Sequence, residues 1–155
     1  MHDHADDMWA DWTTIRSSVE KLQADLYASV AATCDATHAE LDVLLLLHGT
    51  PEARMRFAAL AEAVSFTTGG FTKVADRLTD RGLAERVRCA ADRRTVYLEL
   101  TAAGRTMATA VRDEMSAYLG RHFVQVVGEP LAHDIACAMG QVLRGRTAGA
   151  DPQEP

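Results

Sequence analysis

The hydrophobic period of this 155-residue chain changes from about 3.6 to about 2 at one place, between residues 68 and 100. Before the change, Phe71, Val74 and Leu78 recur at the three- and four-residue steps of a helix that buries one face. After it, residues 83–88 and 95–100 alternate apolar and polar side chains, as the two strands of a β-hairpin do. A helix followed directly by a hairpin restricts the chain to a small set of mixed folds.

Helical patterns precede this region. Residues 8–32 repeat apolar side chains along a narrow seam, which is typical of a helix that packs against other helices. Thr37 and Glu40 have the spacing of a capping box, and the helix that they begin is expected to end at Gly49. A short helix is expected over residues 58–64.

Two helical patterns follow the hairpin. Thr101 is expected to cap the first, whose apolar face continues to about Phe123. Pro130 suits the start of the second, which is expected to bury a face that includes Ile135. From Gly145 the sequence has no periodicity, and a disordered tail is expected. The fold class is therefore mainly α with one small β-hairpin.

Charge is distributed unevenly along the chain. The formal net charge is −6, which taken alone argues against nucleic acid as a partner. Residues 54–105, however, carry ten Lys and Arg against six Asp and Glu, a local charge of +4, and the remainder carries −10. A basic segment between acidic flanks is expected when one face meets a polyanion. A chance distribution of solvated surface charge is the alternative interpretation.

Several classes of protein are excluded. No apolar run approaches the roughly 18 residues of a membrane span, and the opening residues are acidic, unlike a signal peptide. Three widely spaced cysteines argue against a disulfide framework and for the reducing cytoplasm. The sequence has no phosphate-binding loop, nucleophile elbow or zinc-protease motif, so we expect neither an enzyme nor a cofactor.

A short helix, a tight connection, a polar-faced helix and a basic hairpin, in that order, predict a winged helix-turn-helix. The second helix, expected over residues 68–81, would fit the major groove of DNA. Gly69 and Gly70 each weaken such a helix by about 1 kcal/mol relative to Ala, a cost consistent with close approach of the backbone to a partner. Arg93 and Arg94 at the hairpin tip suit a narrow minor groove.

The chain contains, in this order, the motifs TTGGFTKVADRLTDRGLAERV, ADRR and LELTAAG. Each is weak alone, but together, over about residues 41–104, they resemble the MarR family of bacterial transcriptional regulators. The resemblance implies a cytoplasmic homodimer whose first and last helices interleave and whose winged domains bind a pseudo-palindromic DNA operator. The organisation expected is a helical dimerisation region at 1–36 and 105–145, a DNA-binding winged helix-turn-helix domain at 37–104, and a tail at 146–155.

The resemblance also implies roles for single residues. Thr68, Thr72 and Lys73 would face bases, Arg77 would contact a phosphate and Arg94 would enter the minor groove. Family members often carry Arg where this chain has Lys73, which weakens the expected specificity there. Arg86 is expected to buttress the hairpin or to touch the DNA backbone. Asp92 would orient Arg94 through a charge-assisted hydrogen bond. The full set of expected DNA contacts comprises Thr67, Thr68, Gly69, Thr72, Lys73, Arg77, Arg86, Arg88, Asp92, Arg93 and Arg94.

Each of these residues also has a purely structural interpretation. In that interpretation Thr67 is a helix cap and nothing more, and Arg77 is simply the ion-pair partner of Asp76 or Asp80. At the level of the whole protein, a repressor relieved by a small ligand is the function expected. The alternative is a helical ligand-binding or interaction protein that keeps this fold with weak, non-specific DNA binding.

The family responds to phenolic or other lipophilic ligands or to thiol oxidation, and some members bind metal. A ligand pocket would lie between the helical and winged regions, lined by Trp12, Arg16, His38 and His48, although core and surface roles are the alternative for these residues. Cys34, His38 and Glu40 form only a weak zinc candidate, so no metal is assigned. Three cysteines are either redox-active or small hydrophobes: Cys34, Cys89 and Cys137.

Overall fold

The computed structural model describes residues 4–64, 68–89, 92 and 94–148, with the backbone alone for residues 4–6, 32, 68 and 146–148. The chain divides into two compact units, residues 1–116 and 117–155. Each unit is considered by itself below. The first unit contains the sheet and both hydrophobic cores, and the described part of the second is helical except at Gly128.

The N-terminal helix α1 spans His4–Cys34, longer at both ends than the pattern over 8–32 indicated. Its C-terminal turns pack into a hydrophobic core, where Val30 is fully buried. Helix α2 (His38–His48) begins with the expected capping box: Glu40 N–H donates to the Thr37 hydroxyl, and Thr37 N–H donates back to the Glu40 carboxylate. The helix ends at Gly49, as predicted.

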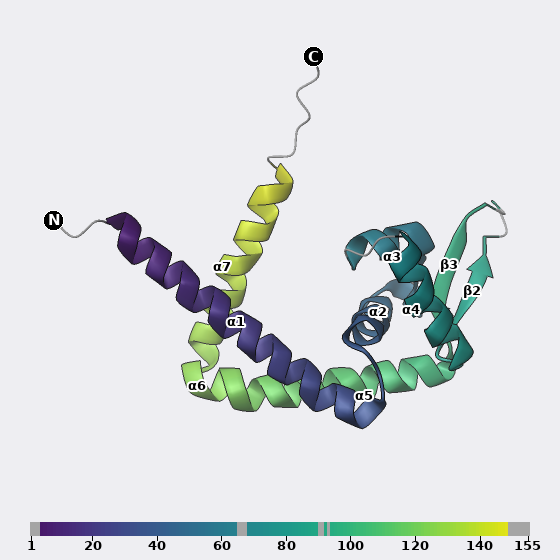
Figure 1. The fold of residues 1–155 in the computed structure, drawn as a ribbon, viewed down its shortest axis with the longest axis horizontal. Helices are drawn as coiled ribbons and strands as arrows, with labels where there is room; N and C mark the ends of the chain where they lie inside the picture. The colour runs from purple at the N-terminus through teal and green to yellow at the C-terminus, as the bar shows by residue number, and fades with distance from the viewer. Residues whose placement is uncertain (1–3, 65–67, 90–91, 93, 149–155) are drawn as a thin grey trace, which may run out of the picture. The chain divides into compact units, whose positions relative to one another are not determined.

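A 3₁₀ turn η1 (Pro51–Ala53) leads into strand β1 (Arg54–Arg56), which is followed by helix α3 (Phe57–Ala63) and helix α4 (Thr68–Asp80). Gly82 lies two residues after α4 with φ at +68°, a conformation that glycine adopts without strain. Helices α2, α3 and α4 form the compact three-helix part of the first unit (Figure 1).

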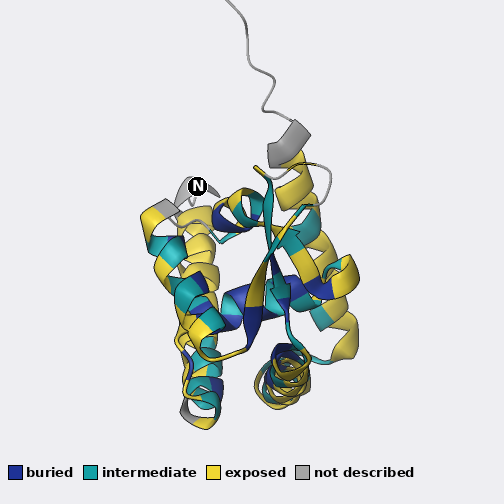
Figure 2. Ribbon diagram, turned by 90° about the vertical axis from the view of Figure 1, so that its right-hand side faces the viewer, coloured by how far each residue is buried: buried dark blue, intermediate teal, exposed yellow. Residues whose placement is uncertain are grey.

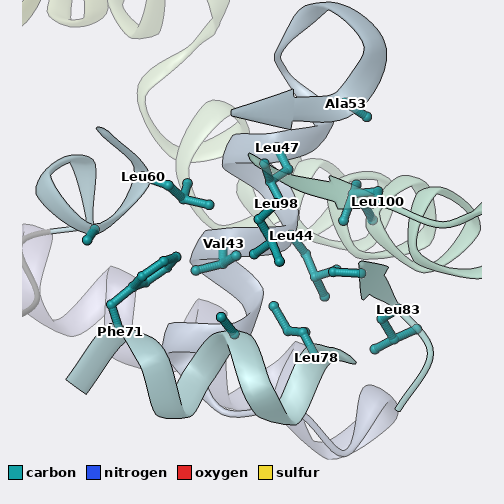
Figure 3. Packing of buried hydrophobic residues seen from close by; sticks show 14 residues of the cluster. Val43, Leu44, Leu47, Ala53, Leu60, Phe71, Leu78, Leu83, Leu98 and Leu100 are labelled. Carbon is teal, nitrogen blue, oxygen red and sulfur yellow. The ribbon is translucent and has the colours of Figure 1, made fainter. Parts of the chain in front are cut away.

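The main core lies between these three helices and the sheet. Phe71 and Leu78 of α4 are fully buried and point toward Val43 and Leu44 of α2, while Leu60 approaches from α3 (Figure 3). The apolar stripe expected on α4 is therefore the side that anchors it. Its polar side is left for other contacts.

The expected hairpin consists of β2 (Ala84–Arg88) and β3 (Val96–Leu100), which pair antiparallel with Arg86 opposite Leu98. Strand β1 pairs with the other edge of β3, so the sheet has the order β1-β3-β2. Viewed from the hairpin side, the strands show exposed positions beside buried ones (Figure 2). β2 and β3 thus form a wing with one face on the core.

Helix α5 (Ala102–Leu119) starts at the cap predicted for it. The Thr101 hydroxyl accepts from Gly104 N–H at 3.0 Å and donates to the Gly82 carbonyl at 2.7 Å. A second, smaller core joins Val30 of α1, Leu41 of α2 and Val111 of α5. The boundary expected at residues 36 and 37 is therefore not a core boundary, because α1 and α2 share this cluster.

The second unit begins with the last turn of α5 and continues through the π-helical segment η2 (Gly120–Val124), α6 (Gln125–Val127) and α7 (Glu129–Ala148). The sequence pattern predicted an uninterrupted helix to Phe123 and did not reveal the π segment. Gly128, with φ at +85°, separates α6 from α7. Helix α7 extends to Ala148, three residues into the expected tail, and residues 149–155 lie outside the description.

The apolar face of α7 was expected to be buried, and this expectation was wrong for the single chain. Leu131, Ile135 and Val142 are 50%, 38% and 56% exposed. The hydrophobic period identifies the apolar face of a helix but not what covers it. None of the described helices is both long and apolar enough to cross a bilayer.

Candidate nucleic-acid interface

The outer face of α4 is small, polar and basic. Gly69, Lys73 and Arg77 are exposed, and Thr72 is half-buried beside the wing. Among the described residues, a Cβ added at Gly69 would meet nothing within 4 Å, so their packing does not require glycine there. The described surroundings therefore leave the backbone of α4 open to close approach at Gly69.

A groove of about 870 Å³ lies between α3, α4 and the wing. Thr72 of α4 lines it together with Arg86 of β2 and Arg94 of the wing tip. Three residues from separate segments, all expected to contact DNA, thus share one concave surface. The remaining lining residues come from the end of β1, from α3 and from the wing: Arg56, Phe57, Ala58, Ala61, Glu62, Thr95 and Val96.

Arg86 connects the wing to helix α4. Its Nη2 lies 2.7 Å from Oδ1 of Asp76, and its guanidinium lies over the ring of Phe57, 5.2 Å from the centroid. Arg86 therefore has the buttressing geometry that was one of its two expected roles. Because it also lines the groove, one side chain joins α3, α4 and β2 at this surface.

Asp92 shapes the wing tip. Its carboxylate accepts from the backbone N–H of Arg94 at 3.0 Å and from the Thr95 hydroxyl at 2.8 Å. The backbone bond to Arg94, followed by the bond from Thr95, holds the pKa of the Asp92 carboxyl below its usual value. Asp92 therefore bonds to the backbone of Arg94 and to Thr95, and not to the Arg94 guanidinium as expected. The Arg94 side chain is exposed in the groove.

Arg77 makes neither of the two ion pairs considered from the sequence. Its Nη2 lies 3.4 Å from Oε2 of Glu40, in α2, and its side chain is 58% exposed. Arg77 and Glu40 are far apart in the sequence, and neither local periodicity nor helix spacing indicates such a contact. Exposure leaves the guanidinium accessible from solvent at the edge of the α4 face.

The structure leaves some expected contacts undescribed. Thr67 and Arg93 lie outside the described residues, and Thr68 is described by its backbone alone, as the first residue of α4. Arg88, the last residue of β2, is exposed. Their roles remain predictions.

Arg56 is a basic lining residue that was missing from the expected DNA contacts. Arg56 ends β1 opposite Tyr97 of β3, is exposed, and contributes a third guanidinium to the groove beside Arg86 and Arg94. The available signal was the sequence Arg-Met-Arg at 54–56, where alternate positions of a strand share one face.

The expected ligand residues are not brought together in the chain. Trp12 and Arg16 lie on exposed turns of α1, where Arg16 pairs with Glu20 at 2.9 Å. His38 and His48 are the first and last residues of α2, and His38 packs against the ring of Tyr27, 4.7 Å between centroids. A pocket lined by these residues remains a prediction.

The cysteines lie in three different settings. Cys34 and Cys89 are half-buried, whereas Cys137 is exposed on α7 beside His133, so it is not the small buried hydrophobe that had been considered. Within the described part of the chain, no three His, Cys, Asp or Glu side chains gather as a metal site would require. Glu40, one residue of the weak zinc candidate, bonds to Thr37 and faces Arg77 and Arg81 instead.

Comparison with known proteins gives one family and a large set of similar structures. Residues 35–95 match the model of the MarR family, which confirms the family resemblance over that segment. No curated protein matches. The fold resembles that of AbsC, a MarR family transcriptional regulator from Streptomyces coelicolor, with a TM-score of 0.77 and 22% identity over 94% of this chain and 99% of that one.

Two further structures were solved with bound partners. A mutant of MarR from E. coli complexed with operator DNA has a TM-score of 0.71 at 20% identity, covering 91% of this chain and 99% of that chain. NadR in complex with 4-hydroxyphenylacetate has a TM-score of 0.70 at 19% identity, covering 90% and 92%. These likenesses confirm the winged helix-turn-helix fold.

Proposed function

We propose that this chain, whose residues 35–95 match the MarR family, is a sequence-specific DNA-binding transcriptional regulator. In this proposal α4 enters the major groove, and the wing reaches the adjacent minor groove. A regulator of this kind acts where the chromosome is, so we expect it in the cytoplasm.

The observation that carries the proposal is the shared groove of Thr72, Arg86 and Arg94. These residues come from a helix, a strand and a loop, yet they line one surface that also includes Arg56. Exposed Lys73 and Arg77 extend the positive charge along α4. A helix that presents threonine and lysine, flanked by guanidinium groups, combines base-reading donors with phosphate contacts.

We further propose that the protein acts as a homodimer. Apolar side chains 38–70% exposed form a stripe on α1 and another on α7, and exposed stripes of this kind mark protein interfaces. A second copy is the partner that would give a palindromic site two reading helices. The stripes consist of Met8, Trp9, Trp12, Ile15 and Val19 on α1, and of Leu131, Ile135, Met139, Val142 and Leu143 on α7.

Repression relieved by a small ligand is the mode of regulation that we propose. NadR was solved with 4-hydroxyphenylacetate, a phenolic acid, on the same fold. The test is a thermal-shift screen of phenolic acids, followed by competition of any stabilising compound against bound DNA. A ligand that raises the melting temperature and releases DNA supports this mode of regulation.

The proposed function is tested by selecting duplexes from a random library and measuring binding against salt. A specific regulator enriches a palindromic sequence, and its log K falls by about 0.9 per neutralised phosphate as log salt rises. Weak binding that is the same for every sequence would instead favour the interaction protein with the same fold.

A further inference from the structure

Three helices meet at one buried carboxylate. Glu40, in the first turn of α2, is 0% exposed. Its Oε2 accepts from the backbone N–H of Thr37 at 2.8 Å and from the Thr37 hydroxyl at 2.7 Å. These bonds fix the carboxylate at the start of α2, in the connection that follows α1.

Two guanidinium groups face the same carboxylate, one from the last turn of α4 and one from the residue that follows the helix. Arg77 Nη2 lies 3.4 Å from Oε2, and Arg81 Nη1 lies 3.5 Å from Oε1. Arg81 also donates through Nη2 to the carbonyl oxygen of Cys34, the last residue of α1, at 3.1 Å. Arg81 therefore joins the end of α1, the start of α2 and the end of α4.

A fully buried carboxylate is tolerated only while its partners remain in place, because an unpaired charge in the interior loses its hydration without compensation. Hydrogen bonds to Thr37 and the charges of Arg77 and Arg81 outweigh the effect of burial, which by itself raises the pKa, and they hold the pKa of Glu40 below its ordinary value. The carboxylate is thus charged at neutral pH. Its two arginines therefore have one favoured arrangement.

We propose that Glu40 is a positioning residue for DNA recognition, which fixes the recognition helix α4 against the junction of α1 and α2 through Arg77 and Arg81. This inference rests on the proposed function. Since α1 carries one of the exposed apolar stripes, Glu40 also links the helix proposed for dimerisation to the helix proposed for reading DNA. Arg77 is 58% exposed, so the same guanidinium can meet a phosphate while it is held.

The test measures specificity rather than stability. Glu40→Gln keeps the size of the side chain and removes its charge, and Arg81→Gln breaks the network from the other side. Two matched controls change the exposed pair of Arg112 and Asp113 on α5: Asp113→Asn and Arg112→Gln. Each full-length variant is titrated with the duplex that the wild type selects and with a scrambled duplex, well below its melting temperature.

We expect Glu40→Gln and Arg81→Gln each to lower affinity for the selected duplex about tenfold, without loss on the scrambled duplex. The controls should keep the wild-type ratio of affinities for the selected and the scrambled duplex. If the wild type selects no duplex, the proposed function fails and this inference with it. The other outcome is a specific wild type with two network variants that keep its ratio of affinities and only melt at a lower temperature. In that case Glu40 is structural only and the inference is overturned. Should Glu40→Gln not fold, Arg81→Gln, whose side chain is 32% exposed, decides the matter alone.

Discussion

Gly104 lies directly against the carbonyl group of Leu83: a Cβ added to Gly104 would come within 1.9 Å of the Leu83 oxygen. The same oxygen accepts from the N–H of Thr101 at 3.1 Å, so the start of α5 is held closely on the turn that follows α4. The Leu-Thr-x-x-Gly motif thus has a packing explanation. It allows the first turn of α5 to touch the backbone.

Gly104→Ala is therefore expected to lower the free energy of unfolding by about 3 kcal/mol, because the backbone at Leu83 must move. Gly69→Ala is the matched control, since a Cβ there meets nothing within 4 Å. It should raise the free energy of unfolding by about 1 kcal/mol through helix propensity. Urea denaturation of both variants checks the pair, and equal effects would contradict the packing explanation.

Arg94→Ala should weaken DNA binding without changing stability, because its exposed side chain lines the groove at the wing tip. We expect the slope of log K against log salt to fall by about 1 if Arg94 neutralises one phosphate charge. Arg112→Ala on α5, outside the groove, is the control. Wild-type affinity in the Arg94 variant would remove the wing tip from the interface.

Lys73→Ala distinguishes base reading from phosphate contact on α4. If Lys73 reads a base, the variant should lose about 1–3 kcal/mol of binding free energy on the selected duplex and should no longer distinguish that base pair from others. Binding to duplexes mutated at single positions measures this. A uniform loss over all sequences would assign Lys73 to the phosphate backbone instead.

The stability of the fold should depend on Glu40 in acid. Because the folded-state pKa of Glu40 lies below its unfolded value, its contribution is complete above the ordinary carboxyl pKa of about 4.3 and is lost as pH falls through the folded pKa. The free energy of unfolding should therefore fall below about pH 5. Glu40→Gln should be less stable at pH 7 and show a flatter decline.

Asp92→Asn provides a comparison for that titration. The pKa of Asp92 is also lowered, so the sign is the same, but its carboxylate lies on an exposed residue and the effect should be smaller. Urea unfolding between neutral pH and pH 3 measures both variants. An acid decline that Glu40→Gln leaves unchanged would show that other carboxylates dominate it.

Val142→Glu on α7 should weaken a homodimer at least about tenfold, because it places a charge in the exposed apolar stripe. His133→Glu is its control: nine residues earlier on the same helix, it lies on the opposite side. Sedimentation velocity over a range of concentrations gives the dissociation constants. Equal dimerisation of both variants would remove the α7 stripe from the proposed interface.

Local signals in the sequence predicted the winged domain well. The capping box at Thr37, the apolar stripe of α4 and the alternation in β2 and β3 act over a few residues, and the structure confirms each of them. Contacts across about 40 residues were missed, notably Arg77 and Arg81 on Glu40, because no periodicity relates such positions. The sequence also could not indicate what packs against the apolar face of α7. An apolar stripe has the same pattern whether it is covered by its own chain or by another chain.

The strand order β1-β3-β2 places β2 at an open edge of the sheet. Such an edge can recruit a strand from another molecule, and charged side chains are a common defence against this. Arg86 and Arg88 lie on this edge, so they also discourage two wings from joining into a continuous sheet. Neutralising both arginines would therefore threaten solubility at high concentration as well as the proposed binding to DNA. A concentrated sample of such a variant should be checked for aggregation before any loss of binding is interpreted.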